Sequence, residues 1–432
     1  MPTNAATSVG ATDPAKASRG KGFRLVCGTR ADLAGVAWAE LAADPKAVHV
    51  KSNELRQVWR IERGGEAFYA KVFRTLRGWE AWRLRLRGRP EVREWRAGDG
   101  ADRLGVPAVR FAALLEPAGP GGEIRAVLVS HAVPNAITLA DFWERIQTLP
   151  QPADRARQAR AVIDAVARLV ANAHASGFLH RDTYSDNVLI VQDDRGDGVE
   201  AFYADLGQAR VGRSVGDRRA AANLAELVQW FRTRSTVGQR MRFLTRYVVE
   251  RYGPAAKRSA GARRLRRRFF RRVAGLALRR QRRLVAKRDS RIFRNNTHFH
   301  TSNLGGGWRG TFTLRFRRRE MDPRPTQPDR TPAEWAEWGR KVLSQAADAG
   351  RIAGSLDRLG LVGRIDRPRG LWDRIVWAFV GSSARRAFRD GHRQRNRDLP
   401  VAAPIAVLER RVGRLVAEAV LVTERAEGRC DA

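Results

Sequence analysis

Cysteine is nearly absent from this chain. Its 432 residues contain only Cys27 and Cys430, one near each end. Thiols so far apart cannot build a disulfide framework, and this favours a reducing compartment. Long apolar runs are missing as well, because the best candidate, 371–380, is short and interrupted by charge. The first residues are small and polar without an apolar signal-peptide core, so we expect a disordered tail and a cytoplasmic protein.

Acidic residues are scarce relative to basic ones. The chain has 82 Lys and Arg against 45 Asp and Glu, which gives a formal net charge of +37. This excess predicts attraction to a polyanion: nucleic acid, an anionic membrane surface or an anionic glycan. No recognisable nucleic-acid module accompanies the charge, so nucleic acid is the partner we do not expect. The length and a 43% hydrophobic fraction allow a two-lobed domain plus a smaller unit.

The most informative motif is His-Arg-Asp at 180–182. Asn187 follows Asp182 by five residues, and the Asp-Leu-Gly triplet that begins with Asp205 lies eighteen residues further on. This spacing, interleaved with short apolar strands, is typical of a kinase active site. It predicts that Asp182 accepts the proton of the attacking hydroxyl. It also predicts that Asn187 and Asp205 hold the Mg²⁺ ions that bridge the phosphates of ATP.

The upstream sequence supplies a candidate cation for the phosphates. Two strand-like runs, 58–61 and 67–73, flank Gly64-Gly65 and predict a β-hairpin with Lys71 in its second strand. A helix then opens at Pro90. Of its two glutamates we expect Glu94, deeper in the helix, to pair with Lys71.

The remaining elements predict how the cleft is built. The strand 125–130 leads to a hinge, where Ser130, His131 and Val133 are expected to contact the nucleotide. Apolar residues at helical spacing over 161–176 predict a buried helix that delivers the loop containing Asp182. The strand-like runs 188–191 and 201–203 would then place Asn187 and Asp205 on one wall.

Three departures from the kinase pattern qualify this interpretation. No Gly-rich loop precedes the hairpin, and Lys-Ser-Asn-Glu at 51–54 stands in its place. No Ala-Pro-Glu segment follows Asp205, which argues against a typical protein kinase. Asn223 occupies a position where kinase-like folds usually have an aspartate. A non-catalytic kinase-like scaffold is therefore the alternative hypothesis, and a kinase for another small-molecule or protein acceptor is a further one.

A strongly basic segment covers 257–294. Its apolar residues Leu265, Phe269, Val273 and Leu276 form a stripe at helical spacing. Such a helix can lie in an anionic membrane interface. Alternatively, it is the last helix of the domain, with the stripe packed on the core and the arginines solvated.

The C-terminal part repeats the beginning of the chain. A shift of 293 residues, without a gap, gives 11 identities in the 37 positions from Arg93 to Val129. The same shift places Arg364 at the position of Lys71 and Ala387 at the position of Glu94. This second copy also lacks a His-Arg-Asp motif, so we do not expect it to be an active kinase by itself.

Together these motifs resemble the lipopolysaccharide kinase family, whose members phosphorylate Kdo or heptose of the lipid A inner core. The resemblance covers roughly 50–310 and rests on Lys71, Glu94, the run 175–182, Asn187 and the Asp-Leu-Gly triplet. It implies ATP- and Mg²⁺-dependent transfer of the γ-phosphoryl group to a sugar hydroxyl of a lipid A–core glycolipid, on the cytoplasmic face of the inner membrane. No residue identifies the sugar, and the oligomeric state stays open.

The expected fold is α+β: a two-lobed, protein-kinase-like domain followed by a degenerate second N-lobe-like unit. We expect a disordered tail over 1–22, an N-lobe over 23–133, a C-lobe over 134–320, a linker over 321–331 and the degenerate repeat over 332–432.

Overall fold

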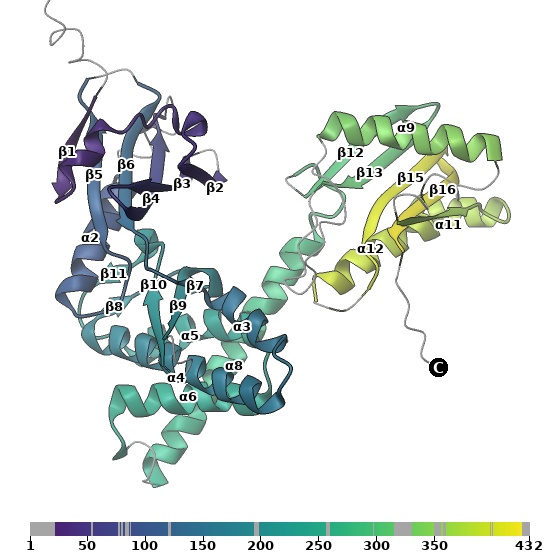
Figure 1. The fold of residues 1–432 in the computed structure, drawn as a ribbon. Helices are drawn as coiled ribbons and strands as arrows, with labels where there is room; N and C mark the ends of the chain where they lie inside the picture. Colours follow the sequence, from purple (N-terminus) through teal and green to yellow (C-terminus); the bar gives the residue numbers. More distant parts are fainter. Residues whose placement is uncertain are drawn as a thin grey trace, which may run out of the picture. The chain divides into compact units, whose positions relative to one another are not determined.

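The computed structural model divides the chain into two compact units, Met1–Ala277 and Leu278–Ala432 (Figure 1). It describes 22–52, 55–76, 78, 81–82, 86, 88–119, 122–193, 198–255, 260–296, 298–314, 331–349, 356, 360–397, 399 and 401–425. The predicted tail, the Asn-Glu pair at 53–54 and nearly all of the predicted linker lie outside these residues. In the described part, no helix is long and apolar enough to cross a membrane.

The first unit begins with an antiparallel six-stranded sheet, in the order β1-β5-β6-β4-β3-β2. Its strands are β1 (Phe23–Gly28), β2 (Ala47–Ser52), β3 (Arg56–Arg63), β4 (Glu66–Arg74), β5 (Phe111–Pro117) and β6 (Ile124–His131). The short 3₁₀ helices η1 (Ala31–Gly35) and η2 (Leu41–Ala43) cover part of it. Alternating apolar residues such as Ile61, Phe68 and Val127 bury one sheet face together with Leu33 and Trp38. This sheet is the predicted N-lobe.

The hairpin and the helix that carry the predicted cation site form as the sequence indicates. Gly64 and Gly65 turn β3 into β4 with φ of 59° and 77°, the left-handed backbone that two-residue hairpins require. Helix α2 (Pro90–Arg103) starts at a proline, whose fixed φ suits the first helical position. The helix packs on β5 and on the short turn η4 (Leu206–Gln208).

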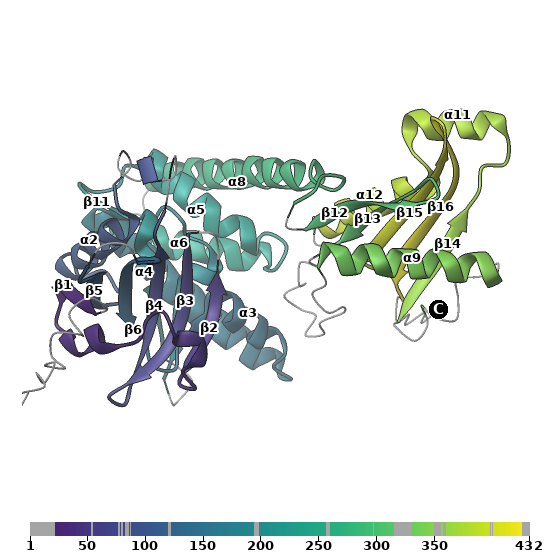
Figure 2. The same ribbon diagram turned by 90° about the horizontal axis from the view of Figure 1, so that it is seen from above.

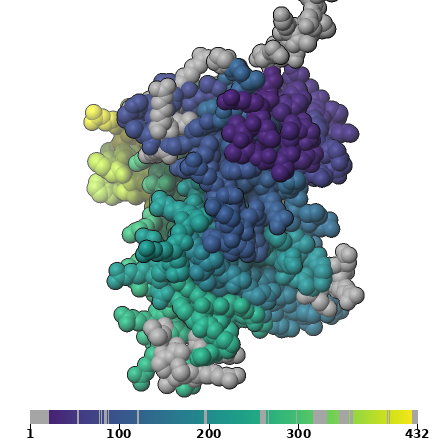
Figure 3. All heavy atoms as spheres, turned by 90° about the vertical axis from the view of Figure 1, so that its left-hand side faces the viewer, coloured from purple at the N-terminus to yellow at the C-terminus, as the bar shows by residue number. Residues whose placement is uncertain are grey.

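The C-lobe is built around the long helix α4 (Pro152–Ser176), which ends at Gly177 in the left-handed conformation. The other helices and strands of this lobe are α3 (Leu139–Gln147), α5 (Asp217–Phe231), α6 (Val237–Tyr252), β7 (Ile137–Thr138), β8 (Phe178–Leu179), β9 (Val188–Gln192), β10 (Val199–Tyr203), β11 (Arg210–Val211) and η3 (Ser185–Asn187). Strands β10, β9 and β7 form a small sheet over α4. One apolar core joins these helices to Ala97 and Ala101 of α2, and Figure 3 shows the N-lobe in purple and blue above the teal C-lobe.

Helix α8 (Ala260–Asp289) is the predicted basic helix, and it runs across the division between the units. Val273 and Ala277 are fully buried in the C-lobe core, and Phe269 and Leu276 pack against it. Leu265 lies outside the described side chains, and the other three residues of the stripe pack within the protein. This confirms the core-helix alternative for those three side chains, which are not free to enter a membrane.

The second unit is a five-stranded antiparallel sheet, in the order β12-β13-β15-β16-β14. Its strands are β12 (Phe299–Gly305), β13 (Trp308–Thr313), β14 (Leu361–Asp366), β15 (Pro404–Val412) and β16 (Leu415–Glu424). Helix α9 (Pro332–Ala349) covers one face, and α11 (Leu371–Val380) and α12 (Ser383–Arg395) cover the other (Figures 1 and 2). Each face has its own apolar core, which buries Trp335 and Phe312 on the first and Phe388 and Trp377 on the second.

This unit repeats the N-lobe in strand register as well as in element order. The 293-residue shift carries β4, α2, β5 and β6 onto β14, α12, β15 and β16. Lys71 pairs with Leu128 in the first unit, and Arg364 pairs with Leu421 in the second. Every pair between β14 and β16 is the shifted image of a pair between β4 and β6. The predicted degenerate second N-lobe-like unit is therefore present.

Helix packing repeats too. A Cβ atom on Gly98 of α2 would lie 2.4 Å from the Phe111 ring, and one on Gly391 of α12 would lie 2.6 Å from Cγ of Pro404. These glycines and their neighbours correspond under the same shift. Both helices thus approach the sheet so closely that only glycine fits.

Two features of the second unit differ from the prediction. Strand β13 pairs with β15, so 299–313 belong to this unit and not to the C-lobe where the domain boundary at 320 placed them. The physical reason is that Phe312 of β13 is fully buried in the core beneath α9. In addition, α9 falls where the repeat would place β2, and most of the segment that corresponds to β3, 349–356, lies outside the described residues. Among the described residues no strand pairs with the outer edge of β14.

Candidate functional site

Lys71, Glu94 and Asp205 meet in the first unit. Strand β4 places the Lys71 Nζ atom 2.5 Å from Oε1 of Glu94, on α2, and 2.7 Å from Oδ1 of Asp205, which follows β10. Glu94 is 1% exposed, so the ion pair is shielded from water. The choice of Glu94 over Glu91 agrees with this geometry, because Glu91 faces Arg89 and Arg125 instead.

Arg56 completes this cluster, and the sequence analysis missed it. Its guanidinium lies 3.1 Å from Oδ2 of Asp205 and 3.8 Å from Oε2 of Glu94. Arg56 is the first residue of β3, two residues before Val58, which pairs with Lys71. Residues two apart on a strand share a face, so the hairpin register could have indicated that Arg56 lies beside Lys71.

The electrostatic balance at Asp205 favours its ionised form. Burial by itself would raise the pKa of this carboxyl, but the nearby charges of Lys71 and Arg56 outweigh burial and hold the pKa well below its usual range. Asp205 has φ of 51°, a left-handed conformation that is uncommon for a residue with a side chain. The following residue, Leu206, is fully buried beside α2, which fixes this turn in place.

Asp182 and Asn187 form a second pair at the loop before β9. The Asn187 amide donates to the Asp182 carbonyl at 2.8 Å and to its carboxylate Oδ2 at 3.2 Å. The Asn187 carbonyl in turn accepts from the backbone of Ala204, the residue before Asp205. The two predicted metal ligands are therefore tied together through the main chain.

A buried network holds this loop from below. The Asn223 amide donates to the His180 carbonyl at 2.7 Å and to Oγ1 of Thr183 at 2.9 Å. Its oxygen accepts from Nε2 of His174 at 3.0 Å, and the other His174 nitrogen accepts from the Tyr247 hydroxyl. Asn223 must donate to two oxygens here, and an aspartate could not. The departure from the kinase pattern is therefore matched by a rearranged set of hydrogen bonds.

Both histidines of this region, His174 and His180, are buried and hydrogen-bonded within the protein, which is typical of structural residues. His180 is fully buried, stacks on Tyr203 and donates from Nε2 to the Ala204 carbonyl at 2.9 Å. Burial lowers its pKa, so the ring is neutral. His174 is equally buried, and burial lowers its pKa to about 4 although the bond to Asn223 opposes the shift.

Of the predicted hinge residues, Ser130 and His131 end β6 and their side chains contact β4, whereas Val133 follows the strand. Ser130 donates to the Tyr69 carbonyl at 3.4 Å, and the His131 ring lies 3.7 Å from Oε2 of Glu66. The carbonyl of Val133 accepts from the backbone of Ala136 in the turn that follows. Nucleotide contacts by these residues stay a prediction.

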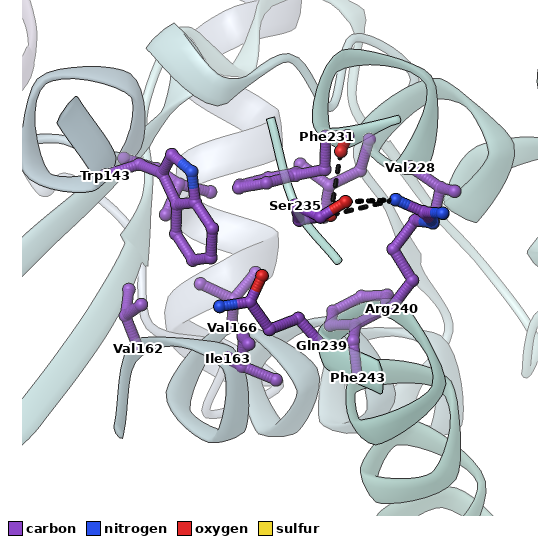
Figure 4. A pocket seen from close by; sticks show the side chains of 12 residues that line it. Trp143, Val162, Ile163, Val166, Val228, Phe231, Ser235, Gln239, Arg240 and Phe243 are labelled. Atoms are coloured by element: carbon purple, nitrogen blue, oxygen red, sulfur yellow. Dashed lines mark hydrogen bonds between the residues drawn. The ribbon is translucent and has the colours of Figure 1, made fainter. Parts of the chain in front are cut away.

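A separate apolar cavity lies in the C-lobe, between α3, α4, α5 and α6 (Figure 4). Trp143, Val166 and Phe243 line it, and Arg240 closes one side through hydrogen bonds to the backbone and side chain of Ser235. None of the residues of the Lys71–Asp205 cluster contributes to this cavity. It therefore belongs to the packing of the C-lobe helices and not to the candidate site.

Comparison with known proteins finds similarity to one family model and to solved structures. Residues 54–247 match the model of the lipopolysaccharide kinase (Kdo/WaaP) family, and no curated protein matches the chain. Among solved structures the chain resembles WaaP in a complex with acyl carrier protein, with 22% identity over 59% of this chain and 99% of that one and a TM-score of 0.41. It also resembles the ROP18 kinase domain bound to AMP-PNP and sucrose (15% identity, 60% and 86% coverage, TM-score 0.34). A further match is a rhoptry antigen kinase domain of Toxoplasma gondii (13% identity, 52% and 82% coverage, TM-score 0.33).

Proposed function

We propose that this chain transfers the γ-phosphoryl group of ATP to a sugar hydroxyl of the lipopolysaccharide inner core, Kdo or heptose, because residues 54–247 match the model of the lipopolysaccharide kinase (Kdo/WaaP) family, a family of phosphotransferases. The observation that carries the proposal is the cluster of Lys71, Glu94 and Asp205 beside the Asp182–Asn187 pair. These five residues are the polar groups that phosphoryl transfer requires for positioning and charge stabilisation.

In this proposal Lys71 binds the α- and β-phosphates of ATP. Glu94 fixes the ammonium group in a buried ion pair, so little reorganisation is needed when the phosphates arrive. Arg56 supplies a second cation at the same place. A guanidinium can bind phosphate oxygens through two N–H groups, and this would compensate for the missing Gly-rich loop.

Asp182 receives the proton of the acceptor hydroxyl. The hydroxyl oxygen forms a bond to the γ-phosphorus, the bond from that phosphorus to the bridging oxygen breaks, and ADP leaves with the electron pair. Asn187 donates to Oδ2 of Asp182, and this bond orients the carboxylate so that its other oxygen is available to the incoming hydroxyl.

The donor set at the site fits Mg²⁺. This ion prefers oxygen ligands and is usually bound by one or two carboxylates together with substrate phosphates. Asp205 offers an ionised carboxylate, and the side-chain oxygen of Asn187 stays available because the amide nitrogen makes the bonds to Asp182. When bound, the metal neutralises negative charge on the phosphates.

The acceptor and the location follow from charge and family. The net charge of +37 favours an anionic acceptor such as a lipid A–core glycolipid over a cationic one. An acceptor of this kind is anchored in a membrane, so we place the reaction at the cytoplasmic face of the inner membrane.

The experiment is Mg²⁺-dependent transfer from γ-labelled ATP to purified lipid A–core acceptors. We expect wild-type protein to label the glycolipid and Asp182→Ala to lower the rate by about 10²- to 10⁴-fold. The matched control is Asp186→Asn, an exposed acidic residue of the same loop, which should keep near-normal turnover.

Near-normal turnover in Asp182→Ala would remove the proposed role of this residue. ATP binding by wild-type protein without transfer to any lipid A–core acceptor would instead favour the non-catalytic scaffold or a different acceptor. Circular dichroism of each variant separates these outcomes from misfolding.

A further inference from the structure

Helix α11 in the second unit exposes an unusual amount of apolar side chain. Five of its ten residues are large, apolar and exposed, and we call them the α11 face: Leu371 (68%), Trp372 (75%), Val376 (37%), Phe379 (88%) and Val380 (53%). A tryptophan and a phenylalanine at such exposure on one short helix need a reason, because contiguous apolar patches mark interaction surfaces.

The α11 face is presented by a firmly packed helix. Successive residues of an α-helix turn by 100°, so the exposed residues occupy one half of the circumference. The other half carries Trp377, which is 7% exposed and packs in the core that α11 and α12 share with β15 and β16. At the start of the helix, Asp373 accepts a hydrogen bond from the backbone of Arg369. The exposed half is thus held outward by a buried half.

The sequence around α11 is strongly basic. Between Arg364 and Arg389 there are seven arginines and two aspartates. Arg369 and Arg374 are exposed and have no side-chain partner among the described residues, whereas Arg364 and Arg367 are paired with Asp366 and Glu418. Unpaired arginines therefore stand beside the N-terminal half of the α11 face.

We propose that the α11 face docks onto an anionic lipid bilayer, with the helix lying in the plane of the interface. Aromatic and aliphatic side chains beside free arginines are the composition of interfacial amphipathic helices. A ten-residue helix is about 15 Å long, half of what is needed to cross the hydrocarbon core, so it can lie in the surface but cannot span it.

Charge favours a lipid bilayer over a second copy of the chain as the partner of the α11 face. Two α11 faces in contact would bring the arginines of both copies together, and juxtaposed like charges oppose association. Lipid phosphates attract the same arginines, by about 1 kcal/mol for each one near the surface. A membrane therefore satisfies both the apolar and the basic part of the patch.

The inference also reassigns the membrane contact that the sequence suggested for the basic helix. The described residues of the α8 stripe, Phe269, Val273 and Leu276, lie in or against the C-lobe core, so this part of α8 offers a bilayer charge and little apolar surface. The α11 face offers charge and unburied apolar surface together, and stable peripheral binding takes both. The docking does not depend on the proposed sugar kinase activity, although a lipid-linked acceptor would be found on the same surface.

The test is co-sedimentation of the full chain with vesicles of phosphatidylcholine alone or of equal parts phosphatidylcholine and phosphatidylglycerol. We expect wild-type protein to pellet with the anionic vesicles at physiological salt. The double variant Trp372→Ser/Phe379→Ser should bind about tenfold more weakly or worse, because its two most exposed apolar groups are gone. The matched control is Val237→Ser/Met241→Ser, two exposed apolar residues of α6, which should bind as wild type.

A second variant tests the basic component independently. Arg369→Gln/Arg374→Gln should weaken binding to anionic vesicles and reduce its dependence on salt concentration. The proposal is overturned if wild-type protein stays in the supernatant with anionic vesicles, or if the Trp372→Ser/Phe379→Ser variant pellets as wild type does. These side chains lie outside the core, so the variants should keep the wild-type circular dichroism spectrum.

Kinase activity separates failure here from failure of the proposed function. Transfer to a delipidated core oligosaccharide should be the same for wild-type protein and both α11 variants. Transfer to acceptor embedded in vesicles should fall only in the variants. Loss of both activities in a folded α11 variant would contradict a role confined to membrane docking.

Discussion

His174 makes the stability of the first unit depend on pH. Burial lowers the pKa of this imidazole from 6.5 to about 4. Below pH 6.5 His174 therefore binds a proton in the unfolded chain but stays neutral in the folded protein. The free energy of unfolding, which is highest above that pH, decreases as the pH falls toward 4. A difference of about 2.5 pKa units corresponds to at most about 3 kcal/mol.

Denaturant unfolding at pH 7.5 and pH 5 measures this loss. His174→Gln should be less stable at pH 7.5 but should lose less stability on acidification, because the titrating group is gone. His49→Gln, at an exposed residue of β2, is the matched control and should follow the wild-type slope. An unchanged pH dependence in His174→Gln would contradict the assignment. His392, whose pKa burial lowers to about 3, gives the second unit a similar acid sensitivity of its own.

At the residue scale, motif spacing could predict the Lys71–Glu94 ion pair, but it did not predict the contacts of Arg56 and Asn223. Lys71 and Glu94 could be paired from sequence because each lies at a fixed place within a regular element. The contact of Arg56 with Asp205 was not predicted, because it joins residues of two different lobes that lie far apart in the sequence. The role of Asn223 was open for a different reason: whether the loop offers it a donor or an acceptor depends on backbone orientation, which no side-chain pattern encodes.

At the scale of elements, the close approach of helix to sheet is the feature that the two units share. Gly→Ala inside a helix usually stabilises by up to about 1 kcal/mol. At Gly98 and Gly391 the new methyl group would instead meet Phe111 or Pro404 well inside contact distance. We expect each substitution to destabilise its own unit by about 1–3 kcal/mol, the usual cost of overpacking.

Gly275 provides the control for this comparison. It lies in the interior of α8, and a Cβ atom there would have no neighbour within 4 Å. Gly275→Ala should therefore leave stability unchanged or raise it. Chemical unfolding of the three single variants decides the matter. Stabilisation by Gly98→Ala or Gly391→Ala would show that the helices can move away from the sheet without cost.

Helices and strands with strong local signals could be predicted from sequence. What each of them packs against or pairs with was harder to predict. The hairpin glycines indicated where β3 ends and β4 begins, and Pro90 indicated where α2 begins. The stripe of α8 indicated a helix, but the pattern is the same whether a membrane or a protein core receives it. Strands β12 and β13 were assigned to the wrong domain because β15, the partner of β13, lies about a hundred residues further along the chain.

At the scale of the whole molecule, the repeat explains why a chain with two N-lobe-like sheets should have one nucleotide site. The second unit retains the residues that pack α12 on its sheet, including Gly391 and the run matching 126–129, which is why the repeat is visible in the sequence. It does not retain the groups for which we propose phosphate binding. Arg364, at the Lys71 position, pairs with its neighbour Asp366, and helix α9 falls where the repeat would place β2.

We therefore expect one ATP per chain in calorimetric titration with Mg²⁺. Lys71→Met should abolish this binding, and Arg364→Met should leave it unchanged. Restoring the ion pair with Arg364→Lys/Ala387→Glu should not create a second site. The shift matches Arg56 to Ala349, and residues 332–432 contain no His-Arg-Asp motif. A second equivalent of ATP in that variant would show that the lysine–glutamate pair suffices without these groups.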